Sequence, residues 1–452
     1  MEVRRCSGGR ATRPLALACA TAAACACAWA GCGSDAPSNP DAAAAVDATP
    51  RVPRLVVPRE SLAPADVAVL VNADDPQSVA VGAHYLTARG IPEANLISLS
   101  LGASYAATQT TTISADTFAA WKAQLDAATP AAIQAYAVTW LYPSVVDCMS
   151  LTSALAFGFD RRWCTQPAPC AATAPSPYFA ADGSTPFTTY HLRPAMMLAG
   201  TSADAADALI DRGVAADATY PLATGYLVRT SDAARSVRYP DFAATAAAWN
   251  RPDSLSVRFE DDSASGTGLV TGEPDVLFYF TGLASVDGID TNHYLPGAIA
   301  DHLTSFGGQI PTSGQMSILR WLEAGATASF GTVVEPCNYP TKFPQASVAI
   351  AHYFRGETLI EAYWKSVAWP GEGLFIGEPL ARPYGTTYAL ADGTMTIRTT
   401  ALVPDRSYEL DSAPDEAGPR TAVMGDISVA APSLKTLAFP ATEPFYRLAP
   451  AP

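Results

Sequence analysis

A strand-length apolar run followed at once by helix signals occurs early in the chain and then recurs, and this repetition most constrains the fold. Residues 66–72, DVAVLVN, are a continuous apolar run, which is typical of a strand buried on both faces of a parallel sheet. Residues 74–90 follow with an aspartate to cap a helix, a proline in its first turn and a glycine to end it. With a second strand predicted at 95–100, this is a β–α–β unit.

The same alternation continues along most of the chain. It predicts strands at 133–143, 194–200, 225–230, 254–260, 276–282, 326–337 and 373–379, a strand ending near residue 302, and helices at 118–128, 202–216, 242–249, 314–325 and 344–368. We therefore expect a doubly wound α/β domain over 61–386, with a mostly parallel sheet and helices on both faces. Residues 388–452 alternate with period two and are broken by prolines, which predicts a small antiparallel β-sandwich that acts as a spacer, lid or interaction module.

The first 32 residues predict a signal peptide. Four arginines precede an alanine-rich apolar stretch that is too short for a comfortable membrane span. The stretch ends in WAGC, which resembles a bacterial lipobox and makes Cys32 a candidate for lipidation, although Trp29 replaces the usual leucine. Ordinary secretion and an uncleaved anchor are the alternatives. Residues 33–60 are rich in Ala, Pro and Asp and predict a disordered tether.

These features predict an exported protein: a lipoprotein of the outer membrane or periplasmic side, or a cell-surface protein. A lipid on Cys32 would tether the chain to a membrane surface without spanning it. The net charge of −15 argues against a nucleic-acid partner, because phosphate binding requires a basic face.

Four cysteines remain after the signal segment and Cys32: Cys148, Cys164, Cys170 and Cys337. An oxidising compartment favours disulfides. Cys164 and Cys170 bracket the proline-rich loop CTQPAPC, so we predict a bridge between them. Cys148 and Cys337 would then form either a long-range bridge or two free thiols.

In an open parallel sheet, ligands bind outside the carboxyl ends of the strands. The candidate binding residues are therefore those that follow the predicted strands: Asn72, Asp74, Cys148, Thr281, Gly282, Ser305, Glu335 and Glu378. Each residue type is also an ordinary cap or turn former.

A catalytic hypothesis rests on Asp301, His302 and Cys337. His302 follows an apolar strand and lies next to Asp301, so it could act as a general base, or it could be a core histidine with satisfied hydrogen bonds. Cys337 ends the next strand and could supply a thiolate nucleophile, or it could be an inert half of a disulfide.

No cofactor is predicted, with calcium as a weak alternative. The acidic loops 260–265 and 287–292 carry oxygen ligands without the spacing of a known calcium loop, which favours solvated loops. The sequence lacks HExxH, GxSxG and a phosphate loop, which excludes the commonest metalloprotease, α/β-hydrolase and nucleotide-binding signatures.

Several segments resemble an uncharacterised family of exported bacterial proteins found in genomes with exosortase-type (PEP-CTERM) protein sorting. The resemblance lies in 67–99, 147–160, 225–240, 296–308 and 321–384. It covers most of 61–386, and the family has no assigned activity, so the resemblance implies kinship without a function.

A more distant resemblance is to gingipain-type cysteine peptidases, which have a caspase-like fold. FYFTGL, AIADHLTS, AGATASFGT and LFIGEP occur in the order of that family's strands, and residues 377–379 match its last motif with Glu for Asp. The catalytic dyad does not carry over, because Thr281 stands at the histidine position and 301–305 contain no cysteine.

Two functions follow as expectations. The first is a non-catalytic surface scaffold that binds a protein or peptide ligand on a caspase-like domain. The second is a cysteine-type hydrolase that uses His302 and Cys337 as a relocated pair. A missing dyad favours the scaffold.

Overall fold

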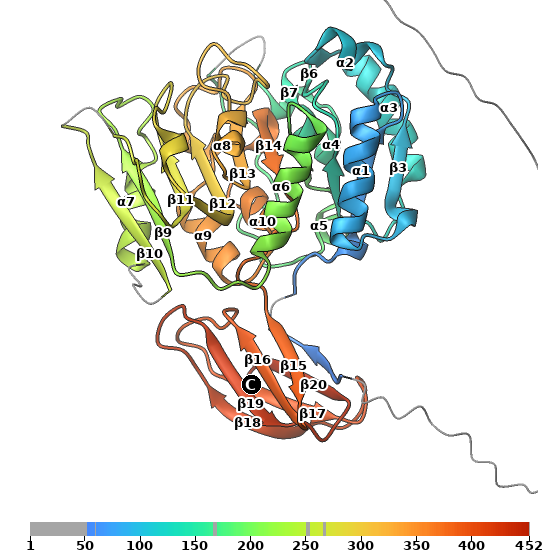
Figure 1. Cartoon of the computed structure of the whole chain (residues 1–452), viewed down its shortest axis with the longest axis vertical. Coiled ribbons are helices and arrows are strands. Elements are labelled where there is room, and N and C mark those ends of the chain that lie inside the picture. Colours follow the sequence, from blue (N-terminus) through green and yellow to red (C-terminus); the bar gives the residue numbers. More distant parts are fainter. Residues whose placement is uncertain (1–51, 59, 166–169, 250–253, 265–267, 452) are drawn as a thin grey trace, which may run out of the picture. The chain divides into compact units, whose positions relative to one another are not determined.

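The computed structural model describes residues 52–58, 60–165, 170–249, 254–264 and 268–451 (Figure 1). The predicted signal peptide, Cys32 and most of the predicted tether lie outside these residues. Within the described ranges, no helix is long and apolar enough to cross a membrane.

A ten-stranded sheet organises the α/β part of the chain, in the order β10-β9-β11-β12-β13-β14-β8-β5-β2-β3 (Figure 1). The strands from β10 to β13 pair parallel, as do those from β8 to β3, whereas β13 and β14 pair antiparallel. The prediction of a mixed α/β fold with a large, mostly parallel sheet is confirmed. The strands are β2 (Val67–Asn72), β3 (Leu96–Leu99), β5 (Ala135–Val138), β8 (Ala195–Met197), β9 (Ala223–Arg229), β10 (Leu255–Asp261), β11 (Val276–Thr281), β12 (Tyr294–His302), β13 (Ala328–Thr332) and β14 (Gly373–Gly377); a small separate sheet contains β4 (Thr112–Ile113), β6 (Val145–Val146) and β7 (Met149–Ser150).

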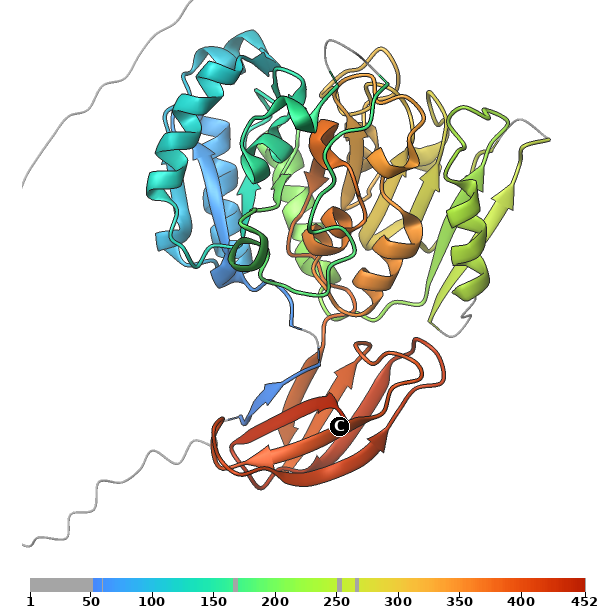
Figure 2. The same ribbon diagram turned by 180° about the vertical axis from the view of Figure 1, so that it is seen from behind.

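Helices cover both faces of the sheet, with α1 and α6 on the face seen in Figure 1 and others on the face seen in Figure 2. Alternate residues of β2 explain this. Val69 packs into the apolar cluster that contains Tyr85 of α1, and Leu70 packs into the cluster that contains Phe118 of α3. The helices are α1 (Pro76–Arg89), α2 (Ser104–Thr108), α3 (Ala115–Ala128), α4 (Leu151–Phe157), α5 (Pro186–Tyr190), α6 (Ala203–Ala216), α7 (Tyr239–Ala248), α8 (Leu319–Glu323), α9 (Ala346–Phe354) and α10 (Leu359–Lys365).

Two predicted helices are shorter than their sequence patterns suggest. The helix expected at 314–325 is only α8, because the backbone N–H of Met316 donates to the Ala284 carbonyl (2.9 Å) and that of Ile318 to the Gly307 carbonyl (2.9 Å). Residues 314–318 are therefore held by neighbouring loops. The helix expected at 344–368 divides into α9 and α10 at Gly356, whose φ of 88° no continuous helix accommodates.

The C-terminal part of the chain forms two sheets around one apolar core that includes Leu55, Met395 and Tyr446. One sheet is β1-β20-β17-β18 and the other is β15-β16-β19. The strands are β1 (Arg54–Val56), β15 (Thr387–Ala391), β16 (Thr394–Thr399), β17 (Tyr408–Ala413), β18 (Thr421–Ile427), β19 (Lys435–Pro440) and β20 (Phe445–Pro450). The expectation of a disordered tether is wrong for β1, because its backbone pairs parallel with β20 and Leu55 is buried.

Candidate functional site

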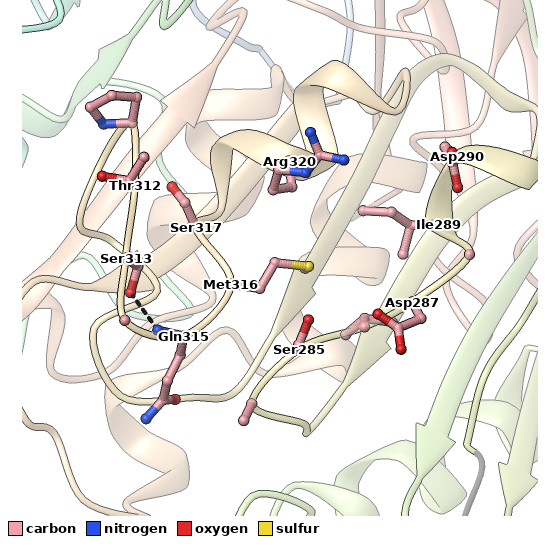
Figure 3. A pocket seen from close by; sticks show the side chains of 15 residues that line it. Ser285, Asp287, Ile289, Asp290, Thr312, Ser313, Gln315, Met316, Ser317 and Arg320 are labelled. Carbon is pink, nitrogen blue, oxygen red and sulfur yellow. Dashed lines mark hydrogen bonds between the residues drawn. The ribbon is translucent and has the colours of Figure 1, made fainter.

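A pocket of about 540 Å³ lies beyond the carboxyl ends of β11 and β12, the edge at which the sequence predicted ligand binding (Figure 3). Residues 284–290, which follow β11, form one wall. Residues 311–317, which follow β12, form the other together with Arg320 of α8. None of the residues that line this pocket is a cysteine or a histidine.

Hydrogen bonds fix both walls. The Met316 N–H donates to the Ala284 carbonyl, which joins one wall to the other. The Ser313 hydroxyl donates to the Phe306 carbonyl (2.8 Å) and accepts from the Gln315 N–H (3.2 Å), as the dashed line in Figure 3 shows. The pocket is therefore preformed by its own loops.

His302 contacts one wall of the pocket through Met316 but does not line the pocket. Its Nδ1 accepts a hydrogen bond from the indole N–H of Trp321 (3.0 Å), so the neutral ring carries its proton on Nε2. That nitrogen lies 3.1 Å from the Met316 carbonyl, to which it donates. The side chain is fully buried, and burial lowers the pKa of His302 to about 3. A neutral imidazole with both nitrogens occupied fits the alternative of a satisfied core histidine.

Asp301 also has a structural role, as part of a buried ion pair. Its carboxylate accepts from the Arg238 guanidinium (2.7 Å) and from the Tyr363 hydroxyl (3.2 Å), and all three side chains are buried. Arg238 also donates to the carbonyl of Thr281 (2.6 Å), so this pair ties the end of β12 to the end of β11. Burial raises the pKa of Asp301, although Arg238 acts in the opposite direction.

The disulfide prediction is wrong in its pairing. Cys148 bonds to Cys164 and Cys170 bonds to Cys337, with Cα–Cα distances of 5.7 Å and 5.1 Å. The predicted bridge between Cys164 and Cys170 would close a local loop, whereas the observed bridges join Cys164 to Cys148, 16 positions away, and Cys170 to Cys337, 167 positions away. The sulfur of Cys337 is therefore not a thiolate, and Cys148 has no free thiol.

The other residues at the predicted binding edge have separate roles. The buried Asn72 accepts backbone N–H bonds from Asp74 (3.1 Å) and Leu101 (3.3 Å). Asp74 accepts from the Ser100 hydroxyl and the Gly102 N–H, both at 2.7 Å, and these bonds lower the pKa of Asp74. Both residues hold the loops after β2 and β3 together.

Thr281 and Gly282 lie at the end of β11 and are buried. The Thr281 hydroxyl has no hydrogen-bond partner. Gly282 is required because a Cβ there would overlap the carbonyl of Arg235. Ser305 is half-buried after β12. These residues shape the sheet edge without lining the pocket of Figure 3.

Glu335 lines a second pocket, of about 450 Å³, with Ser144 and Asp147. One oxygen of Glu335 accepts from the Cys337 N–H (2.8 Å). Asp147 pairs with Arg161 (2.7 Å). The carboxyl edge therefore brings Glu335 close to the loop that carries Cys148, as a binding edge requires. Glu335 does not line the pocket of Figure 3, although Thr312 borders both pockets.

The placement of Glu378 at the binding edge is wrong. Because β14 runs antiparallel to β13, Glu378 lies beside the start of β13, where its N–H donates to the Thr327 carbonyl (3.1 Å). Its buried carboxylate binds Arg89 and the Tyr85 hydroxyl (2.8 Å). Glu378 is therefore the buried ion-pair partner of Arg89, at the edge of the sheet opposite the predicted binding edge.

Most of the residues that form the pocket of Figure 3 were not predicted as site residues from the sequence. Their polar side chains are Ser285, Asp287, Asp290, Thr312, Ser313, Gln315, Ser317 and Arg320. The turn-forming cluster PTSG at 311–314 was the available signal, but a helix was predicted to begin at 314. Carboxylates, hydroxyls, an amide and a guanidinium give this pocket donors and acceptors for a polar ligand, without a nucleophile and base in contact.

The acidic loop 287–292 contributes Asp287 and Asp290 to the pocket, and the end of the loop 260–265 lies outside the described residues. In the described part of the chain, no three His, Cys, Asp or Glu side chains are grouped closely enough to hold a metal ion.

Comparison of the chain with models of known protein families and with curated proteins finds no match in either case.

Proposed function

We propose that this chain is an exported surface protein that binds a peptide or protein segment in the pocket between 284–290 and 311–317, without cleaving it. The observation that carries the proposal is the state of the two residues a thiol mechanism would need. The Cys337 sulfur is bonded to Cys170, and both ring nitrogens of His302 are hydrogen-bonded inside the protein. Neither is available to a substrate.

The chemistry of the pocket supports a peptide ligand. A peptide backbone presents alternating N–H donors and carbonyl acceptors. The exposed carboxylates of Asp287 and Asp290, which have no hydrogen-bond partner among the described residues, can accept from N–H groups, whereas the Arg320 guanidinium can donate to carbonyls. Arg320 pairs with Glu323 (2.6 Å) on the exposed surface, where such a pair is weak enough to exchange for a ligand.

We further propose that the α/β domain belongs to the caspase-like folds and is kin to the exosortase-associated family that the sequence resembles. The parallel neighbours β11, β12 and β13, with β14 antiparallel beside them, support this assignment. Two disulfides support an oxidising compartment. The lipid anchor at Cys32 rests on the WAGC sequence alone.

A peptide selection on the purified, oxidised protein tests binding. Peptides selected from a random display library should bind the wild type and lose affinity for Ser285→Trp, because Ser285 is exposed at the pocket and an indole there fills it. Ser428→Trp, at an exposed site directly after β18, is the matched control and should bind normally. Equal binding to both variants would contradict the proposal.

The absence of cleavage is tested separately. The wild type, with and without a reductant, should leave a mixture of fluorogenic peptides uncut. Cleavage that Cys337→Ser abolishes would instead establish the hydrolase alternative.

A further inference from the structure

A third pocket, of about 550 Å³, lies at the opposite edge of the sheet from the pocket of Figure 3. Its lining comes from three helices: Lys122 and Asp126 on α3, Phe157 at the end of α4, and Phe187 on α5. The segment between α5 and the start of β8 completes it, so it stands at the amino end of that strand. The proposed peptide site makes no use of this region.

Arg193 is the unusual member of this pocket. Its side chain lines the cavity, the residue is only 8% exposed, and no carboxylate of the described residues pairs with it. Its guanidinium donates to the carbonyls of Ile133 (2.9 Å) and Pro130 (3.5 Å), and its Cζ lies 3.3 Å from the centre of the Phe187 ring. The carbonyls accept hydrogen bonds from the Arg193 guanidinium and the ring face contacts it, but none of these groups is a counter-ion. A positive charge without a counter-ion is costly at a buried position.

Two further basic side chains line the same cavity, Lys122 and His191. The one carboxylate among them is Asp126, which is exposed and pairs with Lys122 (2.5 Å) across one helical turn. On a chain whose net charge is −15, this pocket therefore has a locally positive lining. Such a reversal of sign concentrates anions at the pocket.

Apart from Thr129, the remaining lining is apolar. Phe157 and Leu155 of α4, with Phe187 of α5, give hydrocarbon surfaces beside the basic groups. A ligand that matches both features has an aromatic or aliphatic body and one anionic group. The volume fits a small molecule rather than a macromolecule.

We propose that this pocket binds a small amphipathic anion, with its carboxylate or phosphate between Arg193 and Lys122 and its apolar body against Phe157 and Phe187. The guanidinium then gains a counter-ion that no described residue supplies. Lys122 contributes by exchanging Asp126 for the ligand. The proposal is independent of peptide binding at the carboxyl edge.

Calorimetric titration of the full, oxidised chain with phenylacetate and with phenyl phosphate tests the site and distinguishes the two anionic groups. At least one should bind saturably with a dissociation constant below about 1 mM, whereas benzyl alcohol and benzylamine should not. The absence of saturation by both anions, or equal binding of benzyl alcohol, would overturn the proposal.

Two substitutions of opposite expected sign separate ligand binding from a structural role. Lys122→Met keeps the side-chain stem and should weaken binding about fivefold, while Asp126→Asn frees the lysine and should strengthen it about twofold. Lys435→Met, on β19, is the matched charge control and should leave affinity unchanged. A shift in the same direction for both pocket variants, or a shift for the control equal to that for Lys122→Met, would refute the assignment.

Discussion

The free energy of unfolding should decrease as the pH is lowered, and part of this decrease should come from His302. The replacement that isolates this dependence is His302→Gln. A glutamine amide can accept from the Trp321 N–H and donate to the Met316 carbonyl, as the imidazole does, but it does not titrate. The variant therefore keeps the hydrogen-bonding pattern and removes the proton-binding group.

The size of the effect follows from the pKa of His302 in the two states. In the fold it is about 3, and in the unfolded chain it takes the ordinary value of about 6.5. Below about pH 6.5 the unfolded chain binds a proton that the folded protein does not, so the contribution is complete above that pH and is lost as the pH falls toward about 3. The slope is about 1.4 kcal/mol for each pH unit once the unfolded histidine is fully protonated, and at about pH 6.5 it is half protonated, so the loss between about pH 6.5 and about pH 4.5 is about 2.3 kcal/mol.

Urea denaturation at several pH values between about 7 and about 4.5 measures this difference. The free energy of unfolding of the wild type, minus that of His302→Gln, should fall by about 2 to 3 kcal/mol as the pH is lowered across this range. Only the wild type loses the histidine contribution. His293→Gln is the control, since the His293 ring is exposed and lies 2.8 Å from the Pro274 carbonyl through Nδ1. A constant difference between wild type and His302→Gln at all pH values would show that His302 is not held neutral inside the fold.

Further outcomes follow from the disulfides and from the end of β11. Peptide mapping without reduction should recover Cys148 linked to Cys164 and Cys170 linked to Cys337; a Cys164–Cys170 peptide would contradict the structure. In urea, replacing both cysteines of the second bridge by serine should cost about 5 kcal/mol and of the first about 3 kcal/mol, because the bridges span 167 and 16 positions; the reverse order would argue against chain-entropy control. Gly282→Ala should cost about 3 kcal/mol in the same assay, whereas Gly183→Ala, where a Cβ meets nothing within 4 Å, should cost at most about 0.5 kcal/mol; similar values for the two would remove the steric argument.

The alternation of apolar runs with helix signals was enough to predict the architecture. Residues such as Val69 and Leu70 face opposite sides of one strand, so two-sided burial is visible in the sequence itself. Both ends of α1 were also predictable from the sequence. Asp75 caps its first turn by accepting from the Gln77 N–H, and Gly90 ends it with a φ of 62°. Local signals of this kind do not depend on distant partners.

The site was harder to predict because tertiary partners decide it. Nothing near Glu378 in sequence indicates that β14 reverses direction, and that reversal alone moves its carboxylate to the opposite edge. The pairing of Cys170 with Cys337 joins segments far apart in the chain, so the short loop between Cys164 and Cys170 was misleading. Met316 has helix-compatible neighbours, yet a carbonyl of another loop captures its N–H.

The pairing of β1 with β20 makes the C-terminal β-structure discontinuous in sequence: the whole α/β region is inserted between its first strand and the rest. Arg54 lies opposite Phe445, so this sheet cannot gain its last neighbour until almost the entire chain has been synthesised. The ten-stranded sheet, by contrast, has all its strands once Gly377 has emerged. During synthesis the inserted α/β region is therefore expected to fold first, because the β-structure on either side of it is incomplete until both β1 and β20 are present.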